Sequence, residues 1–388
     1  MKLSSRLFTA LAVLGGASTL LLGHPSARSQ TNPQVVASYS VLCDLTQQIA
    51  QDTVDVACLI EAGEDPHLYS ATPSDRRAIE TADLVLYGGY EFEPDIIQMV
   101  ESTDGDTPQI AVSEVAVTDP LLGAAHDHGS HGDNHDDHEK EDNDDHDDHG
   151  DHDDHDDHDH DDHDDHDDHD DHDDHDHDDH DDHDDHDDHD DHDHSEEESV
   201  PDPHVWHDAE NGIAMVRVIQ TELSEVFPDN ADFYQANAET LIARLTQLDS
   251  WIQQQVATVP ASQRVLVTTH DALGYYADAY GVRIEAALES FSTEARPSAA
   301  DLRDLIDLVE DSNIPTVFIE STSNPGLIEA VSRETNIGIS EEPLYADSLG
   351  EVGTPAGTYT GMLMTNTCTI VSGLGGRCDE GAAQAFLD

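Results

Sequence analysis

The chain has 388 residues, of which 88 are acidic and 14 are Lys or Arg, so its formal net charge at pH 7 is −74. A chain of this length is expected to form two domains, each large enough to bury a hydrophobic core. Residues 126–194 hold 39 acidic residues and one Lys, a contribution of −38, and the rest of the chain still carries −36. This charge makes nucleic acid and anionic membrane surfaces poor partners, because they would be repelled.

The N-terminus has the pattern of an export signal. Lys2 and Arg6 precede an apolar run from Leu7 to Gly23, and small and polar residues follow. We predict a signal peptide over residues 1–29, with cleavage near Ser29 and release of a soluble protein into the periplasm. No Cys directly follows the apolar run, so a lipid anchor is not expected. A retained N-terminal anchor is the alternative.

Strand and helix patterns alternate in the segment that follows. They predict strands at residues 35–39, 54–60, 84–87 and 109–112, and helices at 42–51, from 72 onward and at 94–100. Such a β-α-β series is typical of a parallel sheet flanked by helices. His67 lies in a turn just after the second strand, where open α/β sheets place ligand sites. A solvated loop histidine is the alternative interpretation.

Residues 126–194 form a low-complexity tract built mainly from Asp and His, with 23 histidines. The tract has no apolar residue, and a segment without a hydrophobic core cannot offset the entropy lost on ordering. We therefore predict a disordered loop. Its many nitrogen and oxygen donors suit borderline divalent metals, which favours a weak, multivalent metal collector. A solvated spacer is the alternative.

Two helices are predicted after the tract, at residues 208–227 and 231–256. The second shows Leu241, Leu245, Leu248 and Ile252 on one face and would span roughly 40 Å, more than one small domain needs. We predict that it joins two lobes. The expected organisation is an N-terminal lobe over 30–228, a linking helix over 229–258 and a C-terminal lobe over 259–388.

The second half repeats the plan of the first. Strands are predicted at residues 264–268, 283–287, 315–320 and 337–339, and helices after His270 and at 298–312, 325–334 and 359–371. The expected fold class is therefore α/β, with a mostly parallel sheet and flanking helices in each lobe. His270 and Asp347 both lie just past predicted strands.

The four cysteines of the chain are predicted to form disulfides, because an exported protein meets an oxidising compartment. Four cysteines allow three connectivities. We favour the two local pairs, Cys43 with Cys58 and Cys368 with Cys378. No CxxC occurs in the sequence, so a thiolate metal site or a redox centre has little support.

Only four histidines lie outside the signal peptide and the tract, and they are His67, His204, His207 and His270. Three of them fall on junctions between predicted elements in two different lobes, and Asp347 is placed similarly. If His67, His204, His270 and Asp347 converge, they form a site of three nitrogens and one oxygen, which suits Zn²⁺. Mn²⁺ prefers more oxygen ligands.

Four motifs carry a family resemblance. They are Gly63-x-x-Pro66-His67-x-Tyr69, Asp202-Pro203-His204-Val205-Trp206, Thr268-Thr269-His270-Asp271-Ala272-x-Gly274-Tyr275 and Tyr345-Ala346-Asp347-Ser348-Leu349-Gly350. In this order, and with Glu289-x-x-x-x-Glu294-Ala295-x-Pro297-Ser298, they resemble the ligand motifs of the zinc/manganese solute-binding proteins of ABC importers (cluster A-I). The resemblance implies two α/β lobes joined by one long rigid helix, with metal held in the cleft by His67, His204, His270 and Asp347.

The resemblance favours zinc and leaves manganese open. Family members that favour manganese usually have Glu at the position of His270, and many zinc members carry a loop rich in His and acidic residues where this chain has its tract. Many zinc members, however, lack a ligand Asp at the position of Asp347. His207 takes a position that is usually apolar, so it is expected either to face solvent or to pass metal from the tract to His204.

The resemblance implies a periplasmic protein that captures Zn²⁺, or alternatively Mn²⁺, and delivers it to a membrane permease powered by a separate ATPase. We expect a monomer and no enzymatic activity. A zinc hydrolase would need an open coordination position and a general base, and the sequence has no HExxH. A periplasmic metal buffer without a transporter is a further alternative, which a neighbouring permease gene would exclude.

Overall fold

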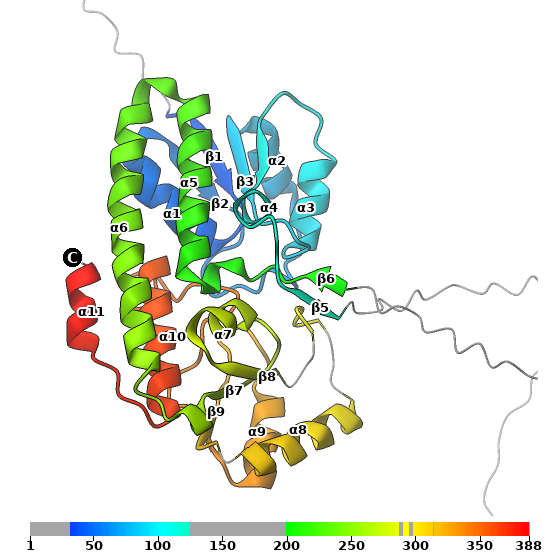
Figure 1. The fold of residues 1–388 in the computed structure, drawn as a ribbon. Helices are drawn as coiled ribbons and strands as arrows, with labels where there is room; N and C mark the ends of the chain where they lie inside the picture. Colours follow the sequence, from blue (N-terminus) through cyan, green and yellow to red (C-terminus); the bar gives the residue numbers. More distant parts are fainter. Residues whose placement is uncertain (1–31, 125–198, 287–289, 295–297, 313, 388) are drawn as a thin grey trace, which may run out of the picture. The chain divides into compact units, whose positions relative to one another are not determined.

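The computed structural model describes residues 32–124, 199–286, 290–294, 298–312 and 314–387 (Figure 1). The predicted signal peptide, the tract at 126–194 and three residues of the motif at 289–298, Glu289, Ala295 and Pro297, lie outside these residues. The described residues on both sides of the tract belong to one compact unit. In this part of the chain, none of the helices combines the length and the hydropathy that a membrane crossing requires.

The N-terminal half contains one sheet of four parallel strands in the order β2-β1-β3-β4. The strands are β1 (Gln34–Ala37), β2 (Asp55–Cys58), β3 (Leu84–Tyr87) and β4 (Gln109–Ala111). Val35 pairs with Val56 on one side and with Leu84 on the other. The central strands β1 and β3 are buried because helices cover the sheet, as their apolar sequences predicted.

Four helices flank this sheet, and one of them, α2, begins with a side-chain cap. They are α1 (Ser40–Ala50), α2 (Pro73–Thr81), α3 (Pro94–Glu101) and α4 (Val112–Ala116). Before α2, Thr72 and Asp75 form a capping box in which each side chain accepts a backbone N–H of the other residue. The predicted strand at 109–112 was one residue too long, because Val112 already begins α4.

A short antiparallel ribbon that the sequence did not predict borders the tract. It pairs β5 (Leu122–Ala124) with β6 (Ser199–Pro201), and Ala124 lies opposite Ser199. The two ends of the segment that contains the tract are therefore neighbours. Each strand has only three residues, which is too short for an alternating pattern to be recognised.

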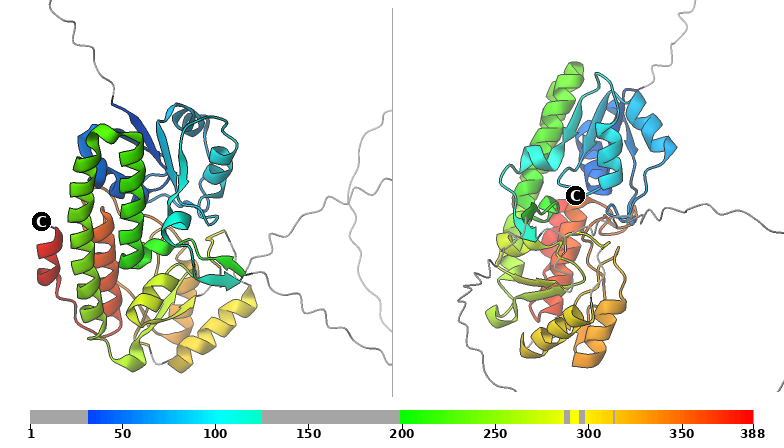
Figure 2. Two further views of the ribbon diagram at one scale, coloured as in Figure 1. Left: turned by 45° about the horizontal axis from the view of Figure 1, so that its top comes forward. Right: turned by 90° about the vertical axis from the view of Figure 1, so that its right-hand side faces the viewer.

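Two long helices follow the ribbon. They are α5 (Ala209–Val226) and α6 (Ala231–Val256), and they pack against each other (Figure 2). Helix α6 also contacts α1 of the N-terminal half and α10 and α11 of the C-terminal half. Its buried face includes Leu241, Leu245, Leu248 and Ile252, as predicted. One long helix thus packs on both halves, whereas the exact lobe boundaries stay a prediction.

The C-terminal half has two parallel strand pairs. Strand β7 (Val265–Thr268) pairs with β8 (Arg283–Ala286), and β9 (Thr316–Val317) pairs with β10 (Gly338–Ile339). The backbone N–H of Phe318 donates to the carbonyl of Val267 and links the two pairs. The predicted strand at 315–320 was therefore too long, although Glu320 still forms an isolated parallel bridge with Leu344.

Helices of the C-terminal half surround these strands. They are α7 (Gly274–Tyr280), α8 (Ala299–Ser312), α9 (Gly326–Thr335), α10 (Tyr359–Gly373) and α11 (Glu380–Leu387). Helix α11 was not predicted. A smaller hydrophobic cluster lies beneath α8 and α9, and the main core extends along α5, α6 and α10.

Both predicted disulfides are present. Cys43 of α1 pairs with Cys58 of β2, and Cys368 of α10 pairs with Cys378 before α11. The Cα atoms are 5.8 and 5.2 Å apart, which is within the usual range for a disulfide. The first bridge fastens α1 to the edge strand of the N-terminal sheet.

Candidate metal centre

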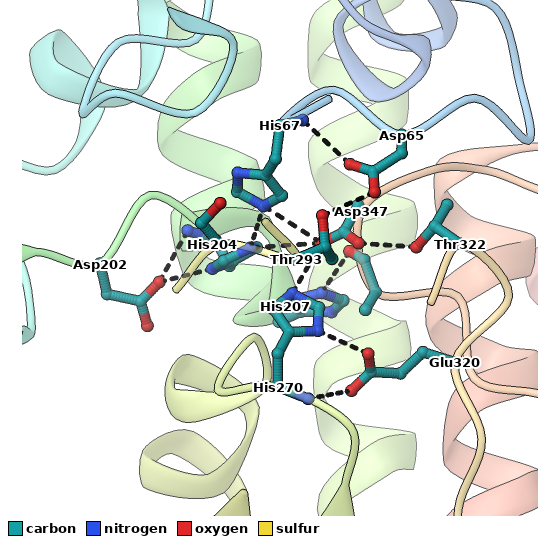
Figure 3. Close-up of polar contacts among 12 residues, drawn as sticks. Asp65, His67, Asp202, His204, His207, His270, Thr293, Glu320, Thr322 and Asp347 are labelled. Atoms are coloured by element: carbon teal, nitrogen blue, oxygen red, sulfur yellow. Dashed lines mark hydrogen bonds and ion pairs between the residues drawn. The ribbon is translucent and has the colours of Figure 1, made fainter. Parts of the chain in front are cut away.

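Four loops far apart in sequence bring His67, His204, His270 and Asp347 together (Figure 3). His67 follows β2, His204 lies between β6 and the 3-10 turn Val205–His207, His270 follows β7, and Asp347 lies between β10 and α10. Each side chain is buried, with His67 the most accessible at 7%. The sequence therefore identified the four residues that converge.

The spacing of the four side chains fits one ion. Oδ1 of Asp347 lies 3.3 Å from Nε2 of His204, 3.2 Å from Nε2 of His270 and 3.7 Å from Nε2 of His67. Nε2 of His67 lies 3.3 Å from Nε2 of His204. A tetrahedral zinc centre with bonds of 2.0–2.1 Å has ligand atoms about 3.3 Å apart. Three of these four separations match that figure, and all four ligand atoms lie within 4.8 Å of one another.

A second carboxylate orients the ring of His204. Oδ1 of Asp202 lies 2.8 Å from Nδ1 of His204 and also accepts the backbone N–H of His204 at 2.9 Å. The ring must therefore carry a proton on Nδ1, so Nε2, which is directed at the other three side chains, is the nitrogen that can bind an ion.

Glu320 orients His270 in the same way. Its Oε2 lies 2.5 Å from Nδ1 of His270, and its Oε1 accepts the backbone N–H groups of Thr269 and His270 at 3.1 and 3.2 Å. The hydroxyl of Ser323 also donates to Oε2. Glu320 was not predicted as a site residue, and its only local signal was its place at the end of the predicted apolar strand at 315–320.

The segment around Asp347 is fixed from several sides. The indole N–H of Trp206 and Nε2 of His207 both donate to the carbonyl of Ala346, at 3.3 and 2.8 Å. The hydroxyl of Thr322 donates to Oδ2 of Asp347 at 2.6 Å. These contacts place Oδ1 toward the histidines.

His207 is buried, so the expectation that it faces solvent is wrong. Its Nε2 must donate, because the carbonyl of Ala346 can only accept, and burial lowers the pKa of His207 to about 3. His207 therefore helps to position the loop of Asp347 as a neutral ring. It does not belong to the four converging groups.

The buried ionisable groups of the site shift one another's pKa values. Burial alone would raise the pKa of Asp347, but the charge of His270 and hydrogen bonds from the three rings hold it well below its usual value. Burial opposes a proton on His270, but Glu320 and Asp347 raise its pKa well above the usual value. Burial lowers the pKa of His67. The carboxylate is therefore ionised without metal, and a cation that binds beside it must displace the proton on Nε2 of His270.

One aromatic ring and two hydrogen bonds accepted by Asp65 surround His67. Phe92 lies edge-on to His67, with ring centroids 5.0 Å apart. Asp65 accepts the backbone N–H of His67 at 3.0 Å and the hydroxyl of Thr293 at 2.6 Å. The second bond joins the loop of His67 to residues 290–294 of the C-terminal half (Figure 3). Such surroundings limit water and strengthen the interaction between the ligands and a cation.

Sequence comparison finds relatives along most of the chain. The family model ZnuA, described as the periplasmic component A of a zinc-uptake complex, matches residues 35–373. The manganese-binding lipoprotein MntA of Halalkalibacterium halodurans is 28% identical over 341 residues, 88% of each chain. The zinc-binding protein TroA of Treponema pallidum is 27% identical over 370 residues, 94% of this chain and 96% of TroA.

Solved structures share the fold. The periplasmic zinc-binding protein TroA from Treponema pallidum aligns with a TM-score of 0.66 at 25% identity, over 88% of this chain and 99% of TroA. A cadmium-bound periplasmic metal-binding protein from Candidatus Liberibacter asiaticus aligns with a TM-score of 0.63 at 23% identity, over 88% of this chain and 100% of that protein. Because this second protein is only 23% identical, its match supports the fold alone.

Proposed function

Because this chain belongs to the family of periplasmic zinc-uptake components, we propose that it captures one Zn²⁺ ion with His67, His204, His270 and Asp347 and delivers it to the permease of an ABC importer. A separate ATPase would power the permease. The family resemblance seen in the four motifs is confirmed by the match over residues 35–373. The observation that carries the proposal is the convergence of four buried ligand groups from four distant loops.

The donor set supports zinc over manganese. Three imidazole nitrogens and one carboxylate oxygen suit a four-coordinate Zn²⁺, whereas Mn²⁺ prefers more oxygen ligands. The separations of 3.2 to 3.7 Å around Asp347 fit short metal bonds. Manganese remains the alternative, because relatives named for manganese and for zinc both align with this chain.

The geometry of the site fits a protein that binds and releases an ion better than one that catalyses a reaction on it. All four side chains are nearly or fully buried, and each offers one donor atom to the same point. A hydrolytic zinc site keeps one position open for water and places a base beside it. The four donors proposed here would instead fill a tetrahedral site. A periplasmic buffer that passes its metal to no transporter is the second candidate, and a permease gene beside this one would exclude it.

The tract is proposed to collect zinc near the binding site. Its 23 histidines and 39 acidic residues offer many weak sites. The pairing of Ala124 with Ser199 anchors both ends of the segment that contains it at one ribbon. Metal held there would raise the local zinc concentration, and the preorganised ligands would then take the ion. We further propose that the protein acts as a monomer in the periplasm.

The proposal is tested by zinc titration of the full chain against a competing chelator. One zinc per chain should resist the chelator, and the tract sites should lose their metal. A variant with His67→Ala and His270→Ala should lose the resistant zinc and keep the weak sites. Glu329→Gln, at an exposed position of α9, is the control. Resistant zinc in the double variant would refute the proposed ligands.

A further inference from the structure

The two oxygens of Asp347 have different partners. Oδ1 lies 3.2 to 3.7 Å from the Nε2 atoms of three histidines, whereas Oδ2 accepts the hydroxyl of Thr322 at 2.6 Å (Figure 3). The carboxylate is buried. Thr322 lies in the loop after β9 and is not one of the converging ligand groups.

The backbone around Asp347 has little freedom to move. The carbonyl of Ala346 accepts two hydrogen bonds, from Trp206 and His207. On the other side, Ser348 accepts the backbone N–H of Gly63 at 2.7 Å, and the N–H of Leu349 donates to Ser40 at 3.0 Å. Because the main chain is held on both sides, the orientation of the Asp347 carboxylate depends on the contacts of its own two oxygens.

We propose that Thr322 determines metal specificity by occupying Oδ2, so that Asp347 binds the ion through Oδ1 alone and the site favours Zn²⁺ over Mn²⁺. The inference rests on the proposed function, because it concerns the same site. With one oxygen from Asp347, the ion has four protein ligands. If both oxygens could bind, the ion would gain a fifth ligand and a second oxygen.

The preference follows from the chemistry of the two ions. Zn²⁺ at fixed sites is usually tetrahedral, and Mn²⁺ favours more ligands and more oxygen. For both oxygens to reach the ion, the carboxylate must rotate and lose the hydroxyl of Thr322. A short hydrogen bond to a buried carboxylate is among the stronger ones, so its loss disfavours the five-coordinate arrangement. Thr322 thus acts against Mn²⁺ without touching the ion.

The test uses two substitutions in the full chain. Thr322→Val keeps the shape and removes the hydroxyl, and Thr322→Ser keeps the hydroxyl as the matched control. One equivalent of Co²⁺ serves as a spectroscopic probe, because four-coordinate Co²⁺ absorbs visible light more strongly than five- or six-coordinate Co²⁺. The tract is identical in all three proteins, so its contribution cancels in the comparison.

The wild type and Thr322→Ser should show intense absorption, and Thr322→Val should lose about half of it or more as a fifth ligand binds. In competition experiments, Thr322→Val should shift the ratio of Zn²⁺ to Mn²⁺ affinity about tenfold toward Mn²⁺. An unchanged spectrum with an unchanged ratio would overturn the inference. Equal loss of both affinities with an unchanged spectrum would also overturn it, since that is the effect of a purely structural role.

The wild type alone provides a second test that needs no variant. Weak, five-coordinate Co²⁺ absorption in the wild type would refute the inference while leaving a single metal site in place. A wild type with no chelator-resistant site for Co²⁺ or Zn²⁺ would instead refute the proposed function. The two failures are therefore distinguishable.

Discussion

Glu320 holds both the ring and the backbone of His270. Its Oε2 lies 2.5 Å from Nδ1 of the ring, and its Oε1 accepts the backbone N–H of His270 at 3.2 Å. Asp202 does the same for His204, at 2.8 and 2.9 Å. One histidine from each half of the chain is thus fixed by a buried carboxylate before any metal binds. Such preorganisation favours the bound state, because fewer groups must be ordered on binding.

Glu320→Gln should lower zinc affinity about 10- to 100-fold. The new amide can still accept the backbone N–H groups through its oxygen, but its NH₂ group cannot accept the Nδ1–H of His270. The ring would then lose the tautomer that leaves Nε2 free. Competition titration against a chelator measures the change, with Glu329→Gln as the exposed control. Equal affinities for Glu320→Gln and the control would show that Glu320 has no part in orienting the ligand.

The pair Cys43–Cys58 should contribute about 3 kcal/mol to the free energy of unfolding. The bridge spans 15 residues, and closing such a loop lowers the entropy of the unfolded chain. Urea denaturation of a double variant, Cys43→Ala with Cys58→Ala, checks the value while Cys368–Cys378 stays intact. A denaturation midpoint equal to that of the wild type would contradict the prediction.

Glu93 should make stability depend on pH. Its Oε1 accepts the hydroxyl of Ser38 and the N–H of Gly88, both at 2.6 Å, and burial raises its pKa to about 7. The folded protein therefore holds this proton more tightly than the unfolded chain, whose value is near 4.5. Stability should fall as pH rises from 4.5 to 7, by up to roughly 3 kcal/mol.

Glu93→Gln should remove this dependence. Without metal, the stability of Glu93→Gln relative to the wild type should be higher at pH 8 than at pH 5, because the amide stays neutral at both values. Urea denaturation at the two pH values measures the difference, and Glu101→Gln at an exposed position is the control. The prediction fails if wild type and Glu93→Gln differ by the same amount at both pH values.

Gly212 and Tyr359 should show coupled effects on stability. The hydroxyl of Tyr359 donates to the carbonyl of Trp206 at 2.6 Å, and a Cβ at position 212 would overlap that tyrosine. Gly212→Ala should therefore destabilise the fold by about 1–3 kcal/mol. Tyr359→Phe should recover part of this loss, because it removes the overlapping hydroxyl. Strictly additive effects in a double-mutant cycle would contradict the close contact.

The sequence predicted the fold class and the four converging residues because both depend on local patterns. Buried strands such as Leu84–Tyr87 are continuous apolar runs, and His67 and His270 follow strands directly. The contacts of Glu320 and Thr322 were not predicted. Their partners lie 50 and 25 residues away, and no spacing rule relates them.

The burial of His207 and the β5-β6 ribbon were not predicted either. A polar residue beside a turn is usually exposed, and only the fold places the carbonyl of Ala346 2.8 Å from the ring of His207. The ribbon joins residues on either side of the tract, and Gly123 pairs with Val200 across it. Three-residue strands carry too little pattern to predict such a pairing.

The central claim is that one divalent ion binds His67, His204, His270 and Asp347 together. The most direct test is a crystal structure of the full chain with Zn²⁺, using anomalous diffraction data collected on both sides of the zinc absorption edge. We expect one strong peak about 2.0–2.2 Å from the three Nε2 atoms and from Oδ1 of Asp347. Zinc peaks elsewhere, with none among these four side chains, would contradict the account.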